Sequence, residues 1–201
     1  MPGFVMGLLR YRLRRCGFEA MQFSYPSIRR DVKSNAAALA RFIASSEVKV
    51  IHLVAHSLGG LVIRQMLYDM PELADRIGRI VTLGTPHNGS ELARRLSSAF
   101  LLHCLLGRSY RHGLDGGVPS WPDGYELGVI AGSTGFGVGT LLGGLPGEND
   151  GTVTVAETRL TGASDHAILP VTHTWMQFSG LVAEQTCAFL KRGRFERSES
   201  V

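Results

Sequence analysis

Ser57 lies between an apolar segment and a helical pattern, and this position makes it a candidate nucleophile. Ser57 follows the nearly continuous apolar, β-branched run at 48–55 and precedes a helical pattern that begins at Leu58. A serine hydroxyl becomes an effective nucleophile only beside a histidine base, which a carboxylate must orient. The surroundings of Ser57 therefore direct attention to the histidines and acids elsewhere in the chain.

The pentapeptide Ala55-His56-Ser57-Leu58-Gly59 has the form of a nucleophile elbow, a sharp turn from a strand into a helix. Small residues at positions 55 and 59 allow the strand and the helix to approach closely. The turn would hold the Ser57 hydroxyl at the carboxyl edge of a sheet. The backbone N–H of Leu58 would face a developing oxyanion there. His56 occupies the variable position of this pattern.

Candidates for the acid and the base lie downstream of this serine. Asp150 stands out because its turn at 148–151 follows an apolar segment at 127–131. A structural Asp-Gly turn is the alternative interpretation of that residue. His173 precedes the last helical pattern, whereas His166 lies in a segment typical of a surface turn. We therefore favour His173 as the base.

The remaining histidines have simpler explanations. His52 lies inside a strand pattern, and His87 lies in a loop that precedes the acid in the chain. His103 and His112 belong to the irregular segment 97–124, which is rich in leucine and is interrupted by glycine and proline. This composition predicts that the segment 97–124 is an inserted cap or lid.

Strand and helix patterns alternate along the chain. Strands are predicted at 18–25, 48–55, 80–83, 127–131 and 152–156. Helices are predicted at 4–13, 29–46, 58–70, from 91 onward with Ser90 as N-cap, and at 174–192. This alternation predicts an α/β fold with a mostly parallel sheet, which we expect to form a single domain over residues 1–201.

Three segments together resemble the bacterial lipase/esterase branch of the α/β-hydrolase superfamily, which includes PGAP1-like proteins. They are LVAHSLGG at 53–60, GTPHNGS at 84–90 and NDGTV at 149–153. The resemblance implies the α/β-hydrolase fold, ester hydrolysis and a catalytic triad of Ser57, Asp150 and His173. It also implies preceding strands and a His-Gly loop with a second oxyanion donor. Residues 1–3 resemble the end of that loop, so we expect the N-terminal strands to be missing.

Composition and charge limit the classes of partner. Hydrophobic residues make up 44% of the 201 residues and charged residues 19%, which is typical of a folded globular domain. The net charge is +4, with many arginines near the N-terminus. No aromatic stacking platform or recognition motif accompanies this charge, so we expect no nucleic-acid partner. Peripheral contact with a membrane surface remains compatible with the basic face.

The odd cysteine count and the lack of cofactor motifs limit the compartment and the chemistry. Cys16, Cys104 and Cys187 show no CxxC spacing, which predicts reduced thiols in a cytosol-like compartment. No apolar run is long enough to span a bilayer and no secretory signal is evident, so we expect a cytoplasmic location. The glycine-rich segment 135–140 lacks the third glycine of a dinucleotide fingerprint. We expect neither a cofactor nor a metal.

These observations favour a serine-dependent carboxylic ester hydrolase that acts through an acyl-enzyme on an apolar ester, either a small molecule or a lipid. An acyltransferase or a thioesterase would use the same residues. A catalytically inactive hydrolase-fold binding protein is the alternative from a different class.

Overall fold

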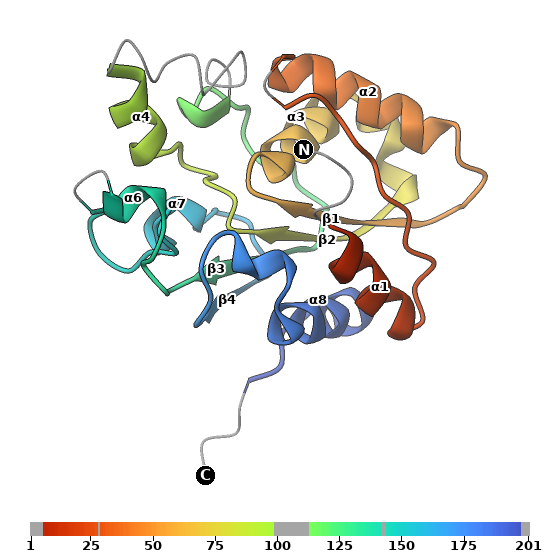
Figure 1. Ribbon diagram of the computed structural model, residues 1–201. Helices are drawn as coiled ribbons and strands as arrows, with labels where there is room; N and C mark the ends of the chain where they lie inside the picture. The colour runs from red at the N-terminus through yellow and green to blue at the C-terminus, as the bar shows by residue number, and fades with distance from the viewer. Residues whose placement is uncertain (1–5, 28, 99–112, 142–143, 198–201) are drawn as a thin grey trace.

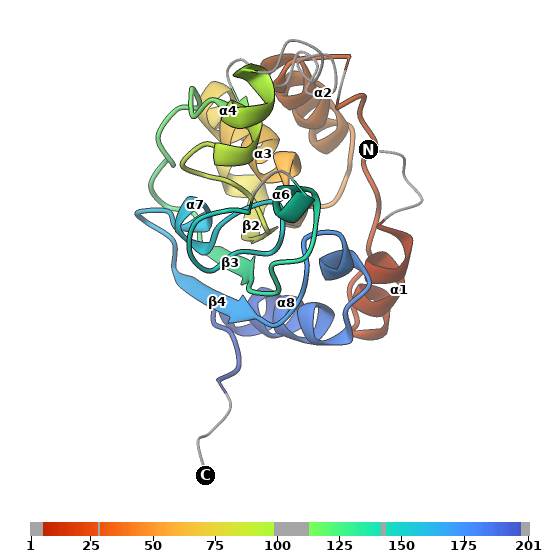
Figure 2. The ribbon, with the colours of Figure 1, turned by 60° about the vertical axis from the view of Figure 1, so that its left-hand side comes forward.

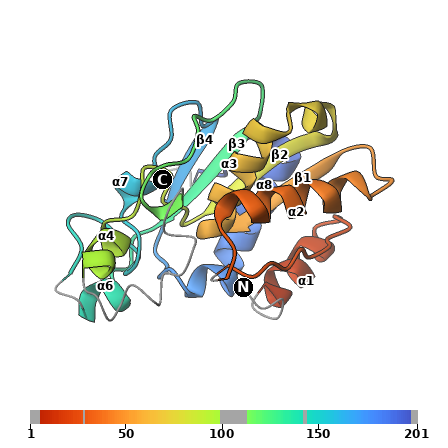
Figure 3. The same cartoon turned by 90° about the horizontal axis from the view of Figure 1, so that it is seen from above.

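The centre of the protein is a sheet of four parallel strands. The computed structural model describes residues 6–27, 29–98, 113–141 and 144–197. The strands lie side by side in their order along the chain, as Figure 3 shows from above. They are β1 (Ile51–His56), β2 (Ile77–Leu83), β3 (Leu127–Gly132) and β4 (Asp165–Leu169), and each neighbouring pair is parallel. The predicted α/β fold with a parallel sheet is confirmed.

Helices cover both faces of this sheet (Figure 1). On one face lie α2 (Val32–Ala44) and α3 (Leu58–Asp69), and on the other lie α1 (Gly7–Arg15) and α8 (Gly180–Arg192). Consecutive strand residues therefore enter opposite layers: Ile80 packs in the α2 and α3 cluster, and Val81 packs in the α1 and α8 cluster. Burial on both faces explains the nearly continuous apolar strands.

Shorter elements connect the strands, and three of them gather at one end of the molecule. These three are α4 (Glu91–Ser98), α6 (Val138–Leu141) and α7 (Val155–Thr158), as Figures 1 and 3 show. The 3₁₀ helices are η1 (Pro71–Arg76) and η4 (Trp175–Gln177). Ser90 caps α4 as predicted, since its Oγ accepts the N–H of Ala93 at 3.1 Å. Half of the predicted cap at 97–124, residues 99–112, lies outside the described residues.

The strand predicted at 18–25 is wrong. This segment has no regular secondary structure, and within the described residues no backbone hydrogen bond joins it to β1. Its aromatic side chains are partly buried instead: Phe23 and Tyr25 pack against the cluster under α2. An alternating apolar pattern produces a strand only where a neighbouring strand completes the hydrogen-bond ladder.

The strand predicted at 152–156 is also wrong, because a helix cap occupies it. The N–H of Glu157 donates to Thr154 Oγ1 at 3.1 Å, and the Glu157 carboxylate accepts the N–H of Thr154 at 2.6 Å. This capping box begins α7. The fourth strand is β4, which contains His166. The surface turn predicted around His166 is therefore wrong.

A disulfide joins Cys16, just after α1, to Cys187 in α8. The two helices lie side by side in Figures 1 and 2. The prediction of reduced thiols is wrong for this pair, and Cys104 lies outside the described residues. Disulfides are characteristic of oxidising compartments, so the cysteine argument for a cytosol-like compartment no longer holds. Among the described residues, the structure contains no helix with the length and apolar character needed to cross a membrane.

Candidate active site

Ser57 sits at the turn between β1 and α3 in a strained backbone conformation. Its φ of 54° is the one positive φ of a non-glycine residue in the described part of the chain. The Ser57 N–H donates to the carbonyl of Leu83 at 2.8 Å. Its own carbonyl accepts the N–H of Gly60 at 3.1 Å and the hydroxyl of Thr85 at 2.8 Å. These bonds hold a conformation that an isolated chain rarely adopts.

Close packing around this turn requires small residues. A Cβ added to Gly59 would lie 3.2 Å from the Cβ of Ala55, which explains why both positions of the elbow pattern are small. A Cβ added to Gly60 would lie 2.4 Å from Thr85 Oγ1. The requirement at position 60 was not predicted from the sequence, although the Gly-Gly pair after Leu58 could have indicated it.

Asp150 and His173 form a buried pair. The carboxylate Oδ2 lies 2.7 Å from His173 Nδ1, and the two residues are 1% and 9% exposed. The second oxygen, Oδ1, accepts the N–H groups of Thr152 and Val153 at 2.9 and 2.7 Å. The backbone N–H of His173 also donates to the Asp150 carbonyl at 2.9 Å. Because the carboxylate accepts at Nδ1, the imidazole presents its Nε2 to other partners.

The glycine-rich segment 135–140 packs against the turn that carries the acid. Gly151 has a φ of 89°, and a Cβ there would lie 2.4 Å from the backbone of Phe136. The N–H of Gly139 donates to the carbonyl of Gly151 at 2.8 Å. The glycines of this segment therefore allow two backbones to approach closely beside Asp150.

Two contacts bring the acid-base pair to the edge of the sheet that carries the serine. Gly84 follows Leu83 at the end of β2, and a Cβ there would lie 3.0 Å from His173 Nδ1 and 3.1 Å from Asp150 Oδ2. His56, the residue before Ser57, places its Nε2 2.9 Å from the His173 carbonyl. Within the described residues, Ser57 Oγ and His173 are not hydrogen-bonded to one another. Such contacts often tighten only when substrate binds.

The first N–H groups of α3 lie beside the serine. The helix begins at Leu58, and its N-cap Ser57 makes no side-chain capping hydrogen bond. The N–H groups of a first helical turn have no partner inside the helix and form the positive end of its dipole. The second donor expected near residues 1–3 lies outside the described residues.

His52, His87 and His166 have partners away from this pair. His87 Nε2 lies 3.1 Å from Thr82 Oγ1, and burial lowers the pKa of His87 to about 3. His166 Nε2 lies 3.0 Å from Thr158 Oγ1. His52 Nδ1 accepts a backbone N–H, and His103 and His112 lie outside the described residues. No group of three side chains suited to a metal ion occurs in the described part of the chain.

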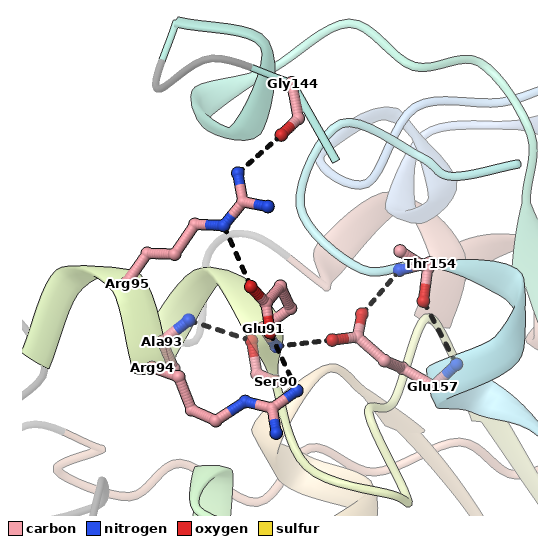
Figure 4. A network of polar contacts seen from close by, with 8 residues as sticks. All are labelled: Ser90, Glu91, Ala93, Arg94, Arg95, Gly144, Thr154 and Glu157. Atoms are coloured by element: carbon pink, nitrogen blue, oxygen red, sulfur yellow. Dashed lines mark hydrogen bonds and ion pairs between the residues drawn. The ribbon is translucent and has the colours of Figure 1, made fainter. Parts of the chain in front are cut away.

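A polar network fixes the start of α4 to the neighbouring elements (Figure 4). Glu157 accepts the N–H of Glu91, the first residue of α4, at 2.5 Å and the N–H of Thr154 at 2.6 Å. Arg95 bridges Glu91 at 3.0 Å and the Gly144 carbonyl at 2.7 Å. These contacts fix the position of α4, the helix that leads into the segment predicted as a cap.

Residues 8–110 match the family model described as "Domain of unknown function (DUF7379)", which covers about half of the chain. The chain belongs to this family. No curated protein sequence matches this DUF7379 member significantly.

Solved structures similar to this DUF7379 member share its fold. The mature lipase BlEst2 of Bacillus licheniformis is 24% identical with a TM-score of 0.65, over 83% of this chain and 76% of the lipase. The metagenomic carboxyl esterase MGS0156 is 21% identical with a TM-score of 0.65, over 84% and 58%. Phospholipase PlaB from Legionella pneumophila is 16% identical with a TM-score of 0.61, over 95% and 53%.

These likenesses show that the protein has the α/β-hydrolase fold. The chain spans about three quarters of the mature lipase and little more than half of the esterase and the phospholipase. At these identities the comparison concerns architecture, and function must be argued from the site itself.

Proposed function

We propose that this DUF7379 member is a serine-dependent carboxylic ester hydrolase. Ser57 is the nucleophile, His173 the general base and Asp150 the acid that orients it. One observation carries the proposal: a strained serine at the start of a helix shares an edge of the sheet with a buried carboxylate–imidazole pair. The likeness to lipases and esterases supports the fold on which this chemistry commonly occurs.

The chemistry proceeds through an acyl-enzyme. His173 Nε2 removes the proton from Ser57 Oγ as the oxygen attacks the ester carbonyl carbon. The imidazolium then gives that proton to the departing alcohol as the C–O bond of the ester breaks. Water, deprotonated by the same imidazole, attacks the acyl carbon. The bond from that carbon to Ser57 Oγ then breaks, the imidazolium returns the proton to Ser57 Oγ, and the carboxylic acid leaves. The Leu58 N–H donates to the oxyanion that forms in each step.

Exposed aromatic side chains next to the base in the chain and beside the acid turn favour an apolar ester. Trp175 is 63% exposed and lies two residues after the base, and Phe136 is 79% exposed beside the acid turn at Gly151. Large apolar side chains left in water near a reactive pair suit an acyl chain or another apolar group. The ester is a small molecule or a lipid.

Covalent labelling with a fluorophosphonate probe tests the nucleophile. We expect the wild-type protein to be labelled and to hydrolyse a short p-nitrophenyl ester, and Ser57→Ala to do neither. Ser133→Ala is the matched control, since Ser133 follows β3 and donates to the Leu169 carbonyl at 3.2 Å. A folded wild-type protein that takes up no label would refute the hydrolase and favour a binding protein.

Product analysis separates hydrolysis from the related acyl transfers. Mass spectrometry of the products, with a competing alcohol added to the water, identifies the acceptor of the acyl group. We expect free carboxylic acid as the main product. A predominance of the transferred ester would identify an acyltransferase that uses the same residues, and preference for a thioester would identify a thioesterase.

A further inference from the structure

His56 connects the strand that carries the serine to the loop that carries the base. Along β1, Leu53 and Ala55 pack toward α2 and α3, whereas Val54 packs toward α8. The alternation of a strand directs His56 to the α8 side, where it is 5% exposed. There its Nε2 lies 2.9 Å from the His173 carbonyl, and the centroids of the two imidazole rings are 4.6 Å apart.

The chemistry of this hydrogen bond determines the tautomer of His56. A carbonyl oxygen can only accept, so Nε2 of His56 carries the proton. Its Nδ1 is buried and has no hydrogen-bond partner in the described part of the chain. Burial, together with the nearby His173, lowers the pKa of His56 to about 3. The ring therefore stays neutral, and its donor remains directed at the same carbonyl near neutral pH.

The hydrogen bond from His56 to the His173 carbonyl differs from the other hydrogen bonds that hold His173. The two bonds between Asp150 and His173 join the acid to the base, and neither reaches the segment that carries the serine. The bond from His56 reaches the same backbone from the residue directly before Ser57. A shift at position 56 would therefore change the distance between the base and the nucleophile.

We propose that His56 is a positioning residue that holds the imidazole of His173 at a fixed distance from the Ser57 hydroxyl. It acts through the hydrogen bond from its Nε2 to the His173 carbonyl, and the inference rests on the proposed function. Misplacing a catalytic group by about 1 Å can lower a rate by about 100-fold. We expect loss of this donor to reduce kcat and to leave KM nearly unchanged.

Two substitutions separate the hydrogen bond from the packing of the ring. His56→Gln keeps a donor near the position of Nε2, and His56→Phe keeps a ring without a donor. We expect His56→Phe to lower kcat for a p-nitrophenyl ester by about 10- to 100-fold and His56→Gln to restore most of it. His52→Phe is the matched control, because His52 lies in the same strand as His56 and the substitution removes a side-chain contact to the Arg79 N–H of β2. That control should retain kcat.

The low-field proton resonance of His173 Nδ1–H gives a readout that does not depend on turnover. We expect it in the wild-type protein and in His56→Gln, and we expect it to shift or broaden in His56→Phe. An unchanged resonance and kcat in His56→Phe, or an equal loss in folded His56→Gln, would overturn the role of the hydrogen bond. If neither the wild-type protein nor the variants turned over the ester, and the resonance changed only in His56→Phe, ester hydrolysis would be refuted. The positioning of His173 by His56 would still be supported.

Discussion

Asp150 Oδ2 and His173 Nδ1 lie 2.7 Å apart although 23 residues separate them in the sequence. Strand β4 and helix α7 occupy the intervening chain, so the sheet itself brings the acid and the base together. The second carboxylate oxygen is held by two backbone N–H groups. The pair is therefore preorganised, and its role can be tested by changing one atom.

Asp150→Asn should lower kcat for a p-nitrophenyl ester by about 10⁴-fold, because an amide can stabilise the wrong tautomer of the base. Its volume is nearly the same, so the fold should persist. His166→Gln is the control, since the His166 ring contacts Thr158 rather than the acid. Steady-state kinetics and circular dichroism measure both proteins. A greater loss of kcat in His166→Gln than in Asp150→Asn would reassign the base.

Gly84→Ala should impair the site through a single methyl group. The new Cβ would lie 3.0 Å from His173 Nδ1 and 3.1 Å from Asp150 Oδ2, in a backbone with a φ of 55°. We expect the pair to move and kcat to fall by about 10-fold or more. Gly17→Ala shares the positive φ but meets nothing within 4 Å, so it should lower Tm and leave kcat intact. Equal kcat in both variants would contradict the placement of Gly84.

Reduction of the bond between Cys16 and Cys187 should lower the thermal stability of the protein. The bond closes a sequence separation of 171 residues, for which the chain-entropy model gives a stabilisation on the order of 5 kcal/mol. We expect Tm, measured by scanning calorimetry, to fall when dithiothreitol is added. Cys16→Ser should start from the lower Tm and should not respond to the reductant. A further drop in that variant would indicate another source of the effect.

Stability should decrease in acid because His87 is buried in its neutral form. Burial, with smaller effects of Arg64 and His166, lowers its pKa from 6.5 to about 3. The unfolded chain therefore binds the proton more readily between these two pH values, and the free energy of unfolding falls as the pH decreases through this window. A single such group contributes a slope of about 1.4 kcal/mol per pH unit.

Urea unfolding at several pH values between 4.5 and 7.5 measures this slope. His87→Gln cannot titrate in this range and keeps an amide that can contact Thr82. Below the unfolded pKa of 6.5 its slope should therefore be smaller by about 1.4 kcal/mol per pH unit, and above that pH the two slopes should agree. A slope equal to that of the wild-type protein would show that His87 is accessible to protons in the folded state.

Local patterns predicted the parts of the fold whose structure depends on near neighbours. The apolar run at β1, followed by small residues, indicated the elbow. The end of the last helix at 192 was also predicted, and Gly193, with a φ of 74°, caps α8 there. Segment 18–25 has the pattern of a strand, but within the described residues no backbone hydrogen bond pairs it with another strand. The disulfide was not predictable, since no spacing relates Cys16 to Cys187.

One error had a signal in the sequence. Thr154 and Glu157 stand three residues apart in the order of a capping box, which outweighs the alternating pattern around them. The turn predicted around His166 had no such signal, because β4 has only five residues and, among the described strands, pairs with β3 alone. For the site, the types and order of Ser57, Asp150 and His173 were accessible from the sequence. The contact between His56 and the His173 carbonyl could not be predicted, because it depends on which face of the sheet the His56 ring lies on.

The order of the strands has a consequence for synthesis on the ribosome. Because β1 to β4 lie side by side in the order in which they are translated, each new strand can add to the one already in place. The turn at Ser57 can form early, while His173 and Cys187 are still to be made. The disulfide can therefore close only after all four strands have been made, and a nascent chain stalled before residue 173 would carry the proposed nucleophile without its proposed base.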